Sequence, residues 1–279
     1  MVKKLPFILL LIMISCGAQE KVKGSRNVKT EKFNLTPFHS IQIAGEFEVS
    51  IVKGSRPKLE IKADDNLIDL IQSEVIDGVL YIKPIKEISR AKSQKIQITF
   101  QDTLKSINIS DKVELESEED LYVEDFQLET KNKSKAFLSL TANSFNLIHG
   151  DDAKAELNVT AKESYFQLNQ SSDVKALVNA PLFKVDIYEK ASARIEGEIQ
   201  DFDLRAGQSS KFDGEKLTAE NATVLAQGRS DNKINVSEKL EISATGNSKT
   251  EIYNSPQINL TQFTDEAVIA KKESKKGLF

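Results

Sequence analysis

Short apolar doublets recur along the second half of the chain at a nearly constant interval. In each doublet two apolar residues flank one intervening residue, at Phe126-x-Leu128, Phe145-x-Leu147, Phe166-x-Leu168, Phe183-x-Val185, Phe202-x-Leu204, Val224-x-Ala226, Leu240-x-Ile242 and Ile258-x-Leu260. The interval between the starts of successive doublets fluctuates only slightly along this series. The pattern therefore indicates a repeating unit of about nineteen residues.

A second series of doublets lies between the members of the first. Its members are Ala136-x-Leu138, Ala155-x-Leu157, Ala176-x-Val178, Ala193-x-Ile195, Phe212-x-Gly214, Ile234-x-Val236 and Thr250-x-Ile252. Each unit thus carries two short strands of alternating polarity, separated by polar turns. Alternation of period two inside a period of roughly twenty residues is typical of a stacked β-solenoid. The sequence predicts an all-β fold with regular coils over residues 104–265.

The units must stack, because one unit cannot fold alone. A unit buries four or five side chains, which contribute roughly 10 kcal/mol at about 2 kcal/mol each. Ordering its backbone costs roughly 20–40 kcal/mol at about 1–2 kcal/mol per residue. Stacking adds ladder hydrogen bonds and buries the faces of neighbouring coils. We therefore expect both series of doublets to point inward, under long flat sides rather than a deep cleft.

The N-terminal third has a less regular strand pattern, predicted as an irregular part of the solenoid over residues 33–103. Residues 38–43 and 47–51 alternate strictly, and further strands are expected at 59–63, 79–82 and 96–100. Asp64-Asp65-Asn66 is a capping sequence, so a short helix is expected directly after it.

Several segments of this third resemble a known family. They are Phe38-His39-Ser40-Ile41-Gln42-Ile43-Ala44-Gly45, Leu59-Glu60-Ile61-Lys62-Ala63-Asp64-Asp65-Asn66, Asp77-Gly78-Val79-Leu80-Tyr81-Ile82 and Leu104-Lys105-Ser106-Ile107. Over residues 33–265 the chain resembles the putative auto-transporter adhesin, head GIN domain family. The resemblance implies a right-handed β-helix-like fold on exported, often lipid-anchored bacterial proteins, and it implies no established activity. The Gly-rich corners of the family are replaced here by turns such as Asp151-Asp152-Ala153-Lys154, in which Asp partly substitutes for Gly.

The chain begins with a leader typical of export. Lys3 and Lys4 precede an apolar run that is too short to span a bilayer, and residues 1–15 are predicted as a lipoprotein signal peptide. Cys16 is the only cysteine and follows Ser15, so it is the predicted lipidation site. Residues 16–32 are predicted as a flexible tether, and residues 266–279 as a basic tail. We expect an outer membrane lipoprotein that faces the periplasm or the cell exterior, with the membrane as its first partner.

Lysine recurs at one position when the units are aligned on the second series of doublets. The equivalent residues are Lys135, Lys154, Lys175, Ser192, Lys211, Lys233 and Lys249. Stacked coils would place these ammonium groups along one ridge, which would suit an anionic polymer such as an acidic glycan. The alternative is that the lysines only solvate a turn and deter edge pairing.

No sequence motif indicates catalysis, a cofactor or a metal site. His39 and His149 have no second ligand at a suitable spacing, and surface or strand-end roles are expected for both. The net charge of −4 does not favour nucleic acid binding. We expect a non-enzymatic binding or adhesion module, with a glycan or an envelope protein as partner. The alternatives are a structural protein that self-associates through the solenoid ends, and a carbohydrate-active enzyme. The oligomeric state stays open.

Overall fold

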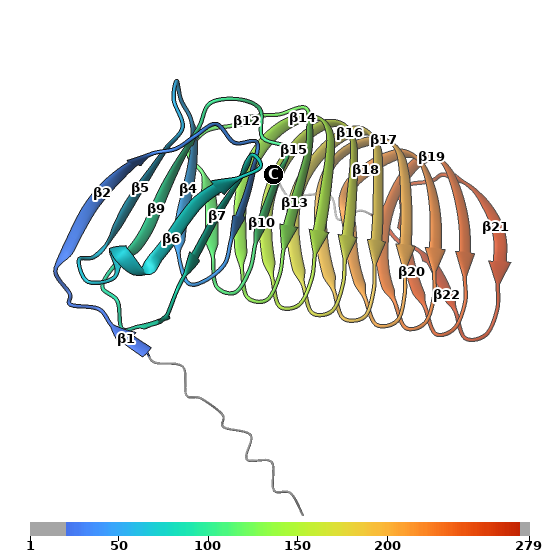
Figure 1. Cartoon of the computed structure of the whole chain (residues 1–279). Coiled ribbons are helices and arrows are strands. Elements are labelled where there is room, and N and C mark those ends of the chain that lie inside the picture. Colours follow the sequence, from blue (N-terminus) through green and yellow to red (C-terminus); the bar gives the residue numbers. More distant parts are fainter. Residues whose placement is uncertain (1–20, 274–279) are drawn as a thin grey trace, which may run out of the picture.

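The computed structural model describes residues 21–273. They form an all-β solenoid of about nine turns, in which parallel coils of about 19 residues stack along one axis (Figure 1). This confirms the predicted fold class. Side chains in the long strands alternate between buried and exposed, as they do over the first eight residues of β15 (Lys154–Leu168). The buried apolar side chains therefore form one continuous hydrophobic core inside the coils, along the whole solenoid.

The regular coils are built from strands that follow one another along the axis. These strands are β12 (Leu121–Tyr122), β13 (Asp125–Thr130), β14 (Lys135–His149), β15, β16 (Asp173–Ile187), β17 (Ser192–Ala206), β18 (Lys211–Ala226), β19 (Asp231–Ala244), β20 (Lys249–Tyr253), β21 (Gln257–Phe263) and β22 (Val268–Lys271). Two or three successive unburied residues near the middle of each long strand break the alternation, for example Asn143 and Ser144 in β14. We call the part before this break the first side of the coil, and the part after it the second side.

The register of the parallel strands corrects the alignment derived from the doublets. On the second side, the position of Phe145 is taken in the next coil by Ser164, and Phe166 pairs with Leu147. Ala222 likewise stands where Val224 was expected. The same displacement by two positions affects the first side, where Val174 and Asn232 replace the expected Ala176 and Ile234. From β13 through β17 the interval between paired positions is constant, without the fluctuation expected from the doublets.

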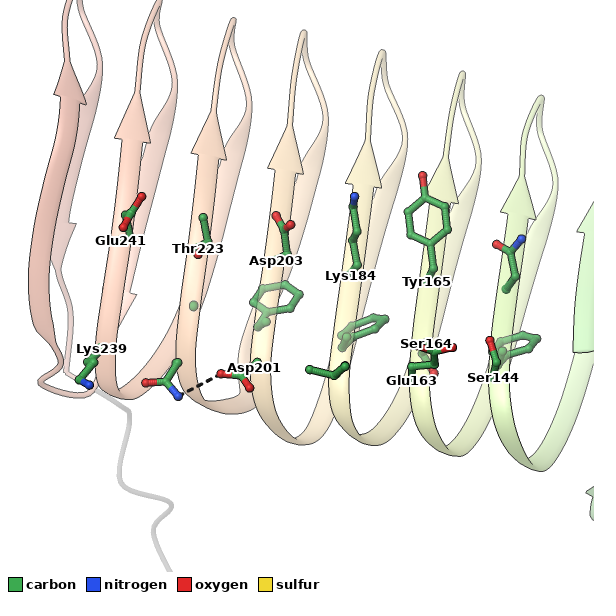
Figure 2. Close-up of a pocket in the computed structure, with 17 residues that line it drawn as sticks. Ser144, Glu163, Ser164, Tyr165, Lys184, Asp201, Asp203, Thr223, Lys239 and Glu241 are labelled. Carbon is green, nitrogen blue, oxygen red and sulfur yellow. Dashed lines mark hydrogen bonds between the residues drawn. The ribbon is translucent and has the colours of Figure 1, made fainter. Parts of the chain in front are cut away.

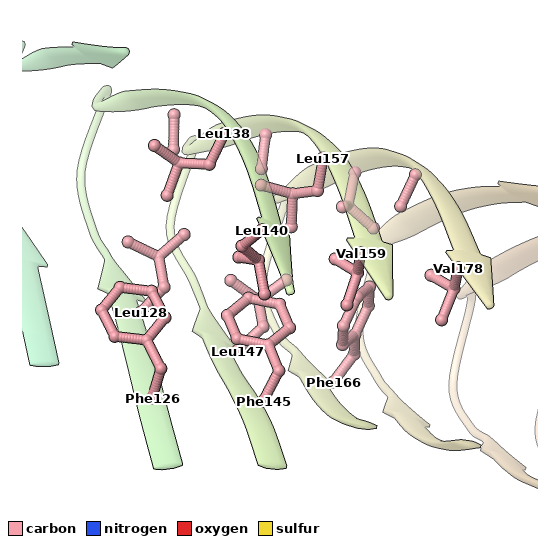
Figure 3. Close-up of a cluster of buried hydrophobic side chains, with 14 of the residues drawn as sticks. Phe126, Leu128, Leu138, Leu140, Phe145, Leu147, Leu157, Val159, Phe166 and Val178 are labelled. Atoms are coloured by element: carbon pink, nitrogen blue, oxygen red, sulfur yellow. The ribbon is translucent and has the colours of Figure 1, made fainter. Parts of the chain in front are cut away.

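The phenylalanine rings nevertheless stack on one another in the core. Phe166 is fully buried and lies 5.8 Å from Phe145 and 5.0 Å from Phe183, measured between ring centroids. Ser164 is small and leaves space in the core. The ring of Phe166, at the next inward position of the same strand, fills that space. Figure 3 shows the rings of Phe126, Phe145 and Phe166 in a row between the two sides of the coil. The inward orientation predicted for the doublets is confirmed except for the last one, whose Ile258 and Leu260 are exposed.

In the solenoid, the turn from the second side of one coil to the first side of the next holds one residue with a positive φ angle. These residues are Asp111, Asn132, Asp151, Gln170, Glu189, Gln208, Gly228, Gly246 and Asp265. Several are joined to the next coil by side chains: Asp151 accepts a 2.9 Å hydrogen bond from the Asn132 amide, and Gln170 accepts one of 2.6 Å from the Asp151 amide. Polar side chains thus support the corners at which the chain lacks glycine.

The N-terminal third begins the solenoid and closes one end of it. Its strands and its one short helix are β1 (Lys21–Lys23), β2 (Val28–Asn34), β3 (Ser40–Ile43), β4 (Glu48–Lys53), β5 (Lys58–Asp64), η1 (Ile68–Leu70), β6 (Ile71–Ile76), β7 (Val79–Pro84), β8 (Glu87–Ser89), β9 (Gln94–Phe100), β10 (Ser106–Ile109) and β11 (Glu114–Ser117). Strands β7, β3 and β10 stack in parallel on the second side, and β9, β4 and β11 stack on the first. Beyond these parallel stacks the neighbouring strands are antiparallel. β6 pairs with β7, β5 pairs with β9, and β2 pairs with β5.

Two of the predicted segment boundaries differ from the structure. The flexible tether is wrong for residues 21–32, because they include β1, which pairs with β8, and most of β2, which pairs with β5. Asp64 fixes this segment: its buried carboxylate accepts hydrogen bonds from the amides of Arg26, Lys92 and Ser93 at 2.7, 3.0 and 3.2 Å. At the other end, β22 falls within the predicted basic tail and pairs with β20. Cys16 and the leader lie outside the described residues.

Candidate functional site

The register separates the six lysines of the predicted ridge into two columns. Lys135, Lys154, Lys211 and Lys249 share one column, whose remaining positions hold Asp173, Ser192 and Asp231. Lys175 and Lys233 lie in the next outward column, which also holds Glu156, Arg194, Asp213 and Glu251. The lysine column as aligned from the sequence is therefore wrong, and the structure places acidic residues between its members.

Carboxylates pair with most of these lysines. The ammonium nitrogens of Lys135, Lys175 and Lys249 lie 2.5, 3.0 and 2.7 Å from the carboxylates of Glu114, Glu156 and Glu251. Lys233 lies between Asp213 at 3.5 Å and Glu215 at 3.4 Å. Lys154 and Lys211 form no ion pair among the described residues, although Asp173 and Asp231 lie beside them in the register. The hydrogen bond from Lys249 to Glu251 raises the pKa of Lys249. This surface carries alternating charge rather than one basic stripe.

A shallow hollow of about 830 Å³ runs across the second side of the solenoid, over strands β14 to β19. We call it the β14–β19 groove. Its outer lining consists of two rows. One row is Asn146, Tyr165, Lys184, Asp203, Thr223 and Glu241, and the other is Ser144, Glu163, Leu182, Asp201, Asn221 and Lys239. Figure 2 shows the labelled members of the first row side by side on successive strands.

Tyr165 is held in a defined orientation within the first row. Its hydroxyl donates a 2.7 Å hydrogen bond to a carboxylate oxygen of Asp186, and the Lys184 ammonium lies 5.5 Å from the ring centroid. Burial and the adjacent Asp186 carboxylate raise the pKa of Tyr165 to about 12, so that its hydroxyl stays protonated. A half-buried aromatic ring held at its polar tip offers a rigid apolar contact to a ligand.

Acidic residues outnumber basic ones in the groove. The two rows together contain two basic residues, Lys184 and Lys239. Their acidic residues are Glu163, Asp201, Asp203 and Glu241. Asn221 donates a 3.0 Å hydrogen bond to Asp201, which links the fourth and fifth strands of the groove (Figure 2). Reasoning from the sequence missed this grouping, because the outward residues looked scattered. The missed signal is the constant spacing of these residues from β14 to β17. In each coil one of them comes directly before, and one directly after, the inward residue that occupies the position of Phe145.

A second hollow of about 760 Å³ lies on the first side. It includes Lys175 together with the exposed side chains of Phe137 and Leu177. The Glu156–Lys175 ion pair lies among the same lining residues. Lys175, predicted as part of a basic ridge, therefore belongs to a mixed apolar and charge-balanced surface.

Comparison with protein families matches residues 37–256 to the family described as "Putative auto-transporter adhesin, head GIN domain". The chain belongs to this head GIN family. The predicted resemblance is thereby confirmed. A comparison with curated proteins found no match. The family indicates a binding or adhesion role in general terms, on an exported or surface protein.

Three solved structures similar to this head GIN chain come from two Parabacteroides species. A protein named a putative lipid binding protein from Parabacteroides distasonis has 16% identity and a TM-score of 0.67, over 91% of this chain and 100% of that one. A putative adhesin from the same species has 14% identity and a TM-score of 0.69, over 90% and 100%. A putative adhesin from Parabacteroides merdae has 14% identity and a TM-score of 0.62, over 90% and 99%. At these identities the likeness concerns the fold alone.

The histidines of this head GIN chain do not approach a set of metal ligands. His149 ends β14, is buried, and contacts the Thr130 hydroxyl and the Asp173 carbonyl, the latter at 3.1 Å. His39 contacts the Ser40 hydroxyl at 3.0 Å. Within residues 21–273, no group of three or more His, Cys, Asp or Glu side chains is arranged to hold a metal ion. The same residues include no helix long and apolar enough to cross a membrane.

Proposed function

We propose that this head GIN protein is a binding module of the cell envelope that holds an extended, uncharged glycan in its β14–β19 groove. Export and lipidation at Cys16 belong to the proposal, which places the protein in the outer membrane as a lipoprotein. The observation that carries it is the row of side chains centred on Tyr165. The row crosses six parallel strands and spans roughly 24 Å at about 4.8 Å per strand. It therefore suits a linear polymer rather than a compact ligand.

The chemistry of the row suits sugar hydroxyl groups. Carboxylates, amides and hydroxyls from Asn146, Asp203 and Thr223 offer both donors and acceptors, and the Tyr165 ring adds an apolar surface. Binding sites for small molecules commonly combine a few convergent polar groups with aromatic contact area. Because the strands are rigid and the Tyr165 hydroxyl is bound to Asp186, little conformational entropy is lost when a ligand binds.

The charge balance favours an uncharged glycan over an acidic one. The groove carries four carboxylates against two ammonium groups, which disfavours a polyanion. The lysines predicted to bind an acidic glycan are largely paired with carboxylates, so little uncompensated positive charge remains there. The lysine ridge keeps its role as a competing hypothesis in the experiment below.

Binding without catalysis is favoured by the exposure of the carboxylates. A glycosidase needs one carboxylic acid that stays protonated near neutral pH, and burial is the usual means. Glu163, Asp201 and Glu241 are exposed and therefore solvated. An acyl chain is also a poor fit, because the groove would leave these charges against hydrocarbon.

The proposal is tested with the chain lacking residues 1–16 and a panel of immobilised polysaccharides. We expect retention on an uncharged glycan that changes little with salt, because no ion pairs are involved. Tyr165→Ala should weaken binding at least tenfold, about 1.4 kcal/mol. Tyr122→Ala is the matched control, because Tyr122 is exposed outside the groove.

Other outcomes would contradict the proposal. Retention only on acidic polysaccharides, weakening steeply with salt and lost in a Lys154→Ala/Lys211→Ala variant, would assign binding to the lysine ridge. New reducing ends would indicate an enzyme, and binding to phospholipid vesicles alone would indicate a lipid-binding protein. For the anchor, Cys16→Ser in the full chain should move the protein from the membrane to the soluble fraction. Unchanged membrane attachment would exclude lipidation as its cause.

A further inference from the structure

The two ends of the solenoid differ in how their strand edges are covered. At the N-terminal end the antiparallel strands β5 and β6 close the coil, and β2 adds a further strand on β5. At the C-terminal end β21 pairs with β19 and β22 pairs with β20. Among the described residues no strand pairs with the outer edge of either β21 or β22. The backbone of this last coil therefore presents unused donors and acceptors.

The last coil also leaves the hydrophobic core open. Ile258 and Leu260 continue the inward positions of Leu240 and Ile242, which are 1% and 0% exposed. Ile258 and Leu260 are themselves 49% and 47% exposed. Phe263, which continues the inward position of Ala244, is 51% exposed. Strand-edge groups and apolar side chains thus coincide on one surface, which we call the open end.

At the open end β22 carries Lys271, but the β21 edge lacks the charges that usually protect an exposed strand. No charged residue occurs from Asn254 to Thr264, which includes all of β21. By contrast, the outer strand β2 of the closed end carries Lys29, Glu31 and Lys32. Proteins commonly place charges on an edge strand to prevent pairing with another chain. The absence of charge over this whole stretch points to an edge that pairs.

We propose that a second copy of this chain covers the open end. A two-fold rotation about an axis perpendicular to the solenoid sets β21 antiparallel to β21 of the second copy, and β22 antiparallel to its counterpart. Both sheets then continue from one copy into the other, and the apolar side chains meet in a common core. With the axis beside Leu260, the central residue of β21, that residue faces its own counterpart. Every other residue faces the one equally far on the other side of the axis, so an uncharged strand avoids like-charge repulsion.

The arrangement predicts a closed dimer rather than a filament. The charged, antiparallel strands of the closed end do not match the neutral edge of β21, which disfavours head-to-tail growth. The contact surface is one coil, residues 257–273, which is smaller than the roughly 20–30 residues a side of a standard interface. We therefore expect a reversible dimer with a dissociation constant in the micromolar range.

The proposal is tested by sedimentation velocity over a range of protein concentrations. The protein used begins at residue 16 and carries the substitution Cys16→Ser. We expect monomer at low concentration and dimer at high concentration, and small-angle scattering should show a particle almost twice as long as the monomer. Leu260→Lys should abolish the dimer, because each copy would bring a buried charge against its counterpart. Thr30→Lys, on the outer strand of the closed end, is the matched control and should leave the dimer intact. Circular dichroism confirms that both variants stay folded.

Four results would overturn the proposal. A monomer at every concentration would show that the open end does not pair. A dimer that is no longer than the monomer would place the contact on a side of the solenoid. A dimer insensitive to Leu260→Lys would place it elsewhere. A dimer that forms only after deletion of residues 274–279 would show that the chain's own terminus covers the open end.

Discussion

The solenoid contains two consecutive regions that share one architecture but differ in regularity. From β13 to β17 the interval between paired positions never changes, and rings from Phe126 to Phe202 lie 5.0–6.0 Å from their neighbours. From β18 to β20 the register shifts, first between Arg194 and Glu196 of the preceding strand and again within β18 and β19. We call these the regular and the irregular region.

The inward residues explain this difference. In the irregular region Ala222 takes the position of Phe202, and the polar Asn232 and Thr250 take the position that Val174 holds earlier, while Phe212 at the start of β18 still stacks on Phe202 at 5.3 Å. Bulky interlocking rings tolerate no extra residue, whereas small side chains leave room for one. Gly197, with φ of +128°, comes directly after the first shift, and a Cβ there would lie 2.0 Å from the Val178 carbonyl oxygen. Since coils contact only their neighbours, the two regions can be perturbed separately.

The largest expected effect is removal of a ring from the regular region. Phe166→Ala deletes a fully buried side chain that contacts two other rings, so we expect a loss of about 3–5 kcal/mol in the free energy of unfolding. Urea denaturation measures the loss, and hydrogen exchange should show reduced protection in β14–β16 while β19 and β20 keep theirs.

Phe137→Ala is the control for this substitution. Phe137 lies in the same region but is 41% exposed, so its removal should cost less than about 1 kcal/mol. Similar losses for the two variants would mean that the ring stack is not what makes the first region regular.

The second effect comes from the one buried histidine of the regular region. Burial lowers the pKa of His149 to about 4, from an ordinary value near 6.5. The Asp173 carbonyl can only accept, so Nε2 of the neutral ring donates to it and Nδ1 accepts from the Thr130 hydroxyl. The unfolded chain binds a proton below about pH 6.5, whereas the folded chain does so only near pH 4. Stability is therefore complete above pH 6.5 and declines as the pH falls toward 4.

The decline should reach about 2 kcal/mol at pH 5 and about 3 kcal/mol below pH 4, at about 1.36 kcal/mol per pKa unit. Chemical denaturation at pH 7.5 and pH 5 measures it. His149→Leu is the comparison variant, because Leu168 occupies the same position in the next coil. That variant should lose less stability between the two pH values. An identical decline in both proteins would assign the pH dependence to other groups.

Reasoning from the sequence reached the fold because a two-residue alternation inside a nineteen-residue period leaves few other structures. It misplaced Phe166 because it aligned the largest residues of successive coils. The backbone register instead aligns Ser164 with Phe145, and Phe166, at the next inward position, fills the space that the small Ser164 leaves in the core. The same misalignment placed Lys175 in the column of Lys154, whereas the structure places it in the next column, beside Glu156. Core volume can be supplied from a neighbouring position, so residue size alone does not determine register.

The β14–β19 groove could not be predicted in this way. Its outward side chains follow the same period but share no chemical type, as Glu163, Leu182 and Asp201 show for one row. Only the backbone register brings them together. The closed end was missed for a related reason, because antiparallel strands such as β5 and β6 alternate just as parallel ones do.

The smallest expected effect compares one substitution in both regions. Thr130 and Thr250 are both fully buried, but the Thr130 hydroxyl is bonded to His149 and the Thr250 hydroxyl has no partner among the described residues. Thr250→Val removes an unpaired polar group at the position that Val174 holds in the regular region, so it should stabilise the protein by up to about 1 kcal/mol. Thr130→Val leaves the His149 ring nitrogen without a donor and should destabilise by about 1–2 kcal/mol. Urea midpoints at pH 7.5 measure both changes, and equal signs would show that buried polar groups are not what distinguishes the irregular region from the regular one.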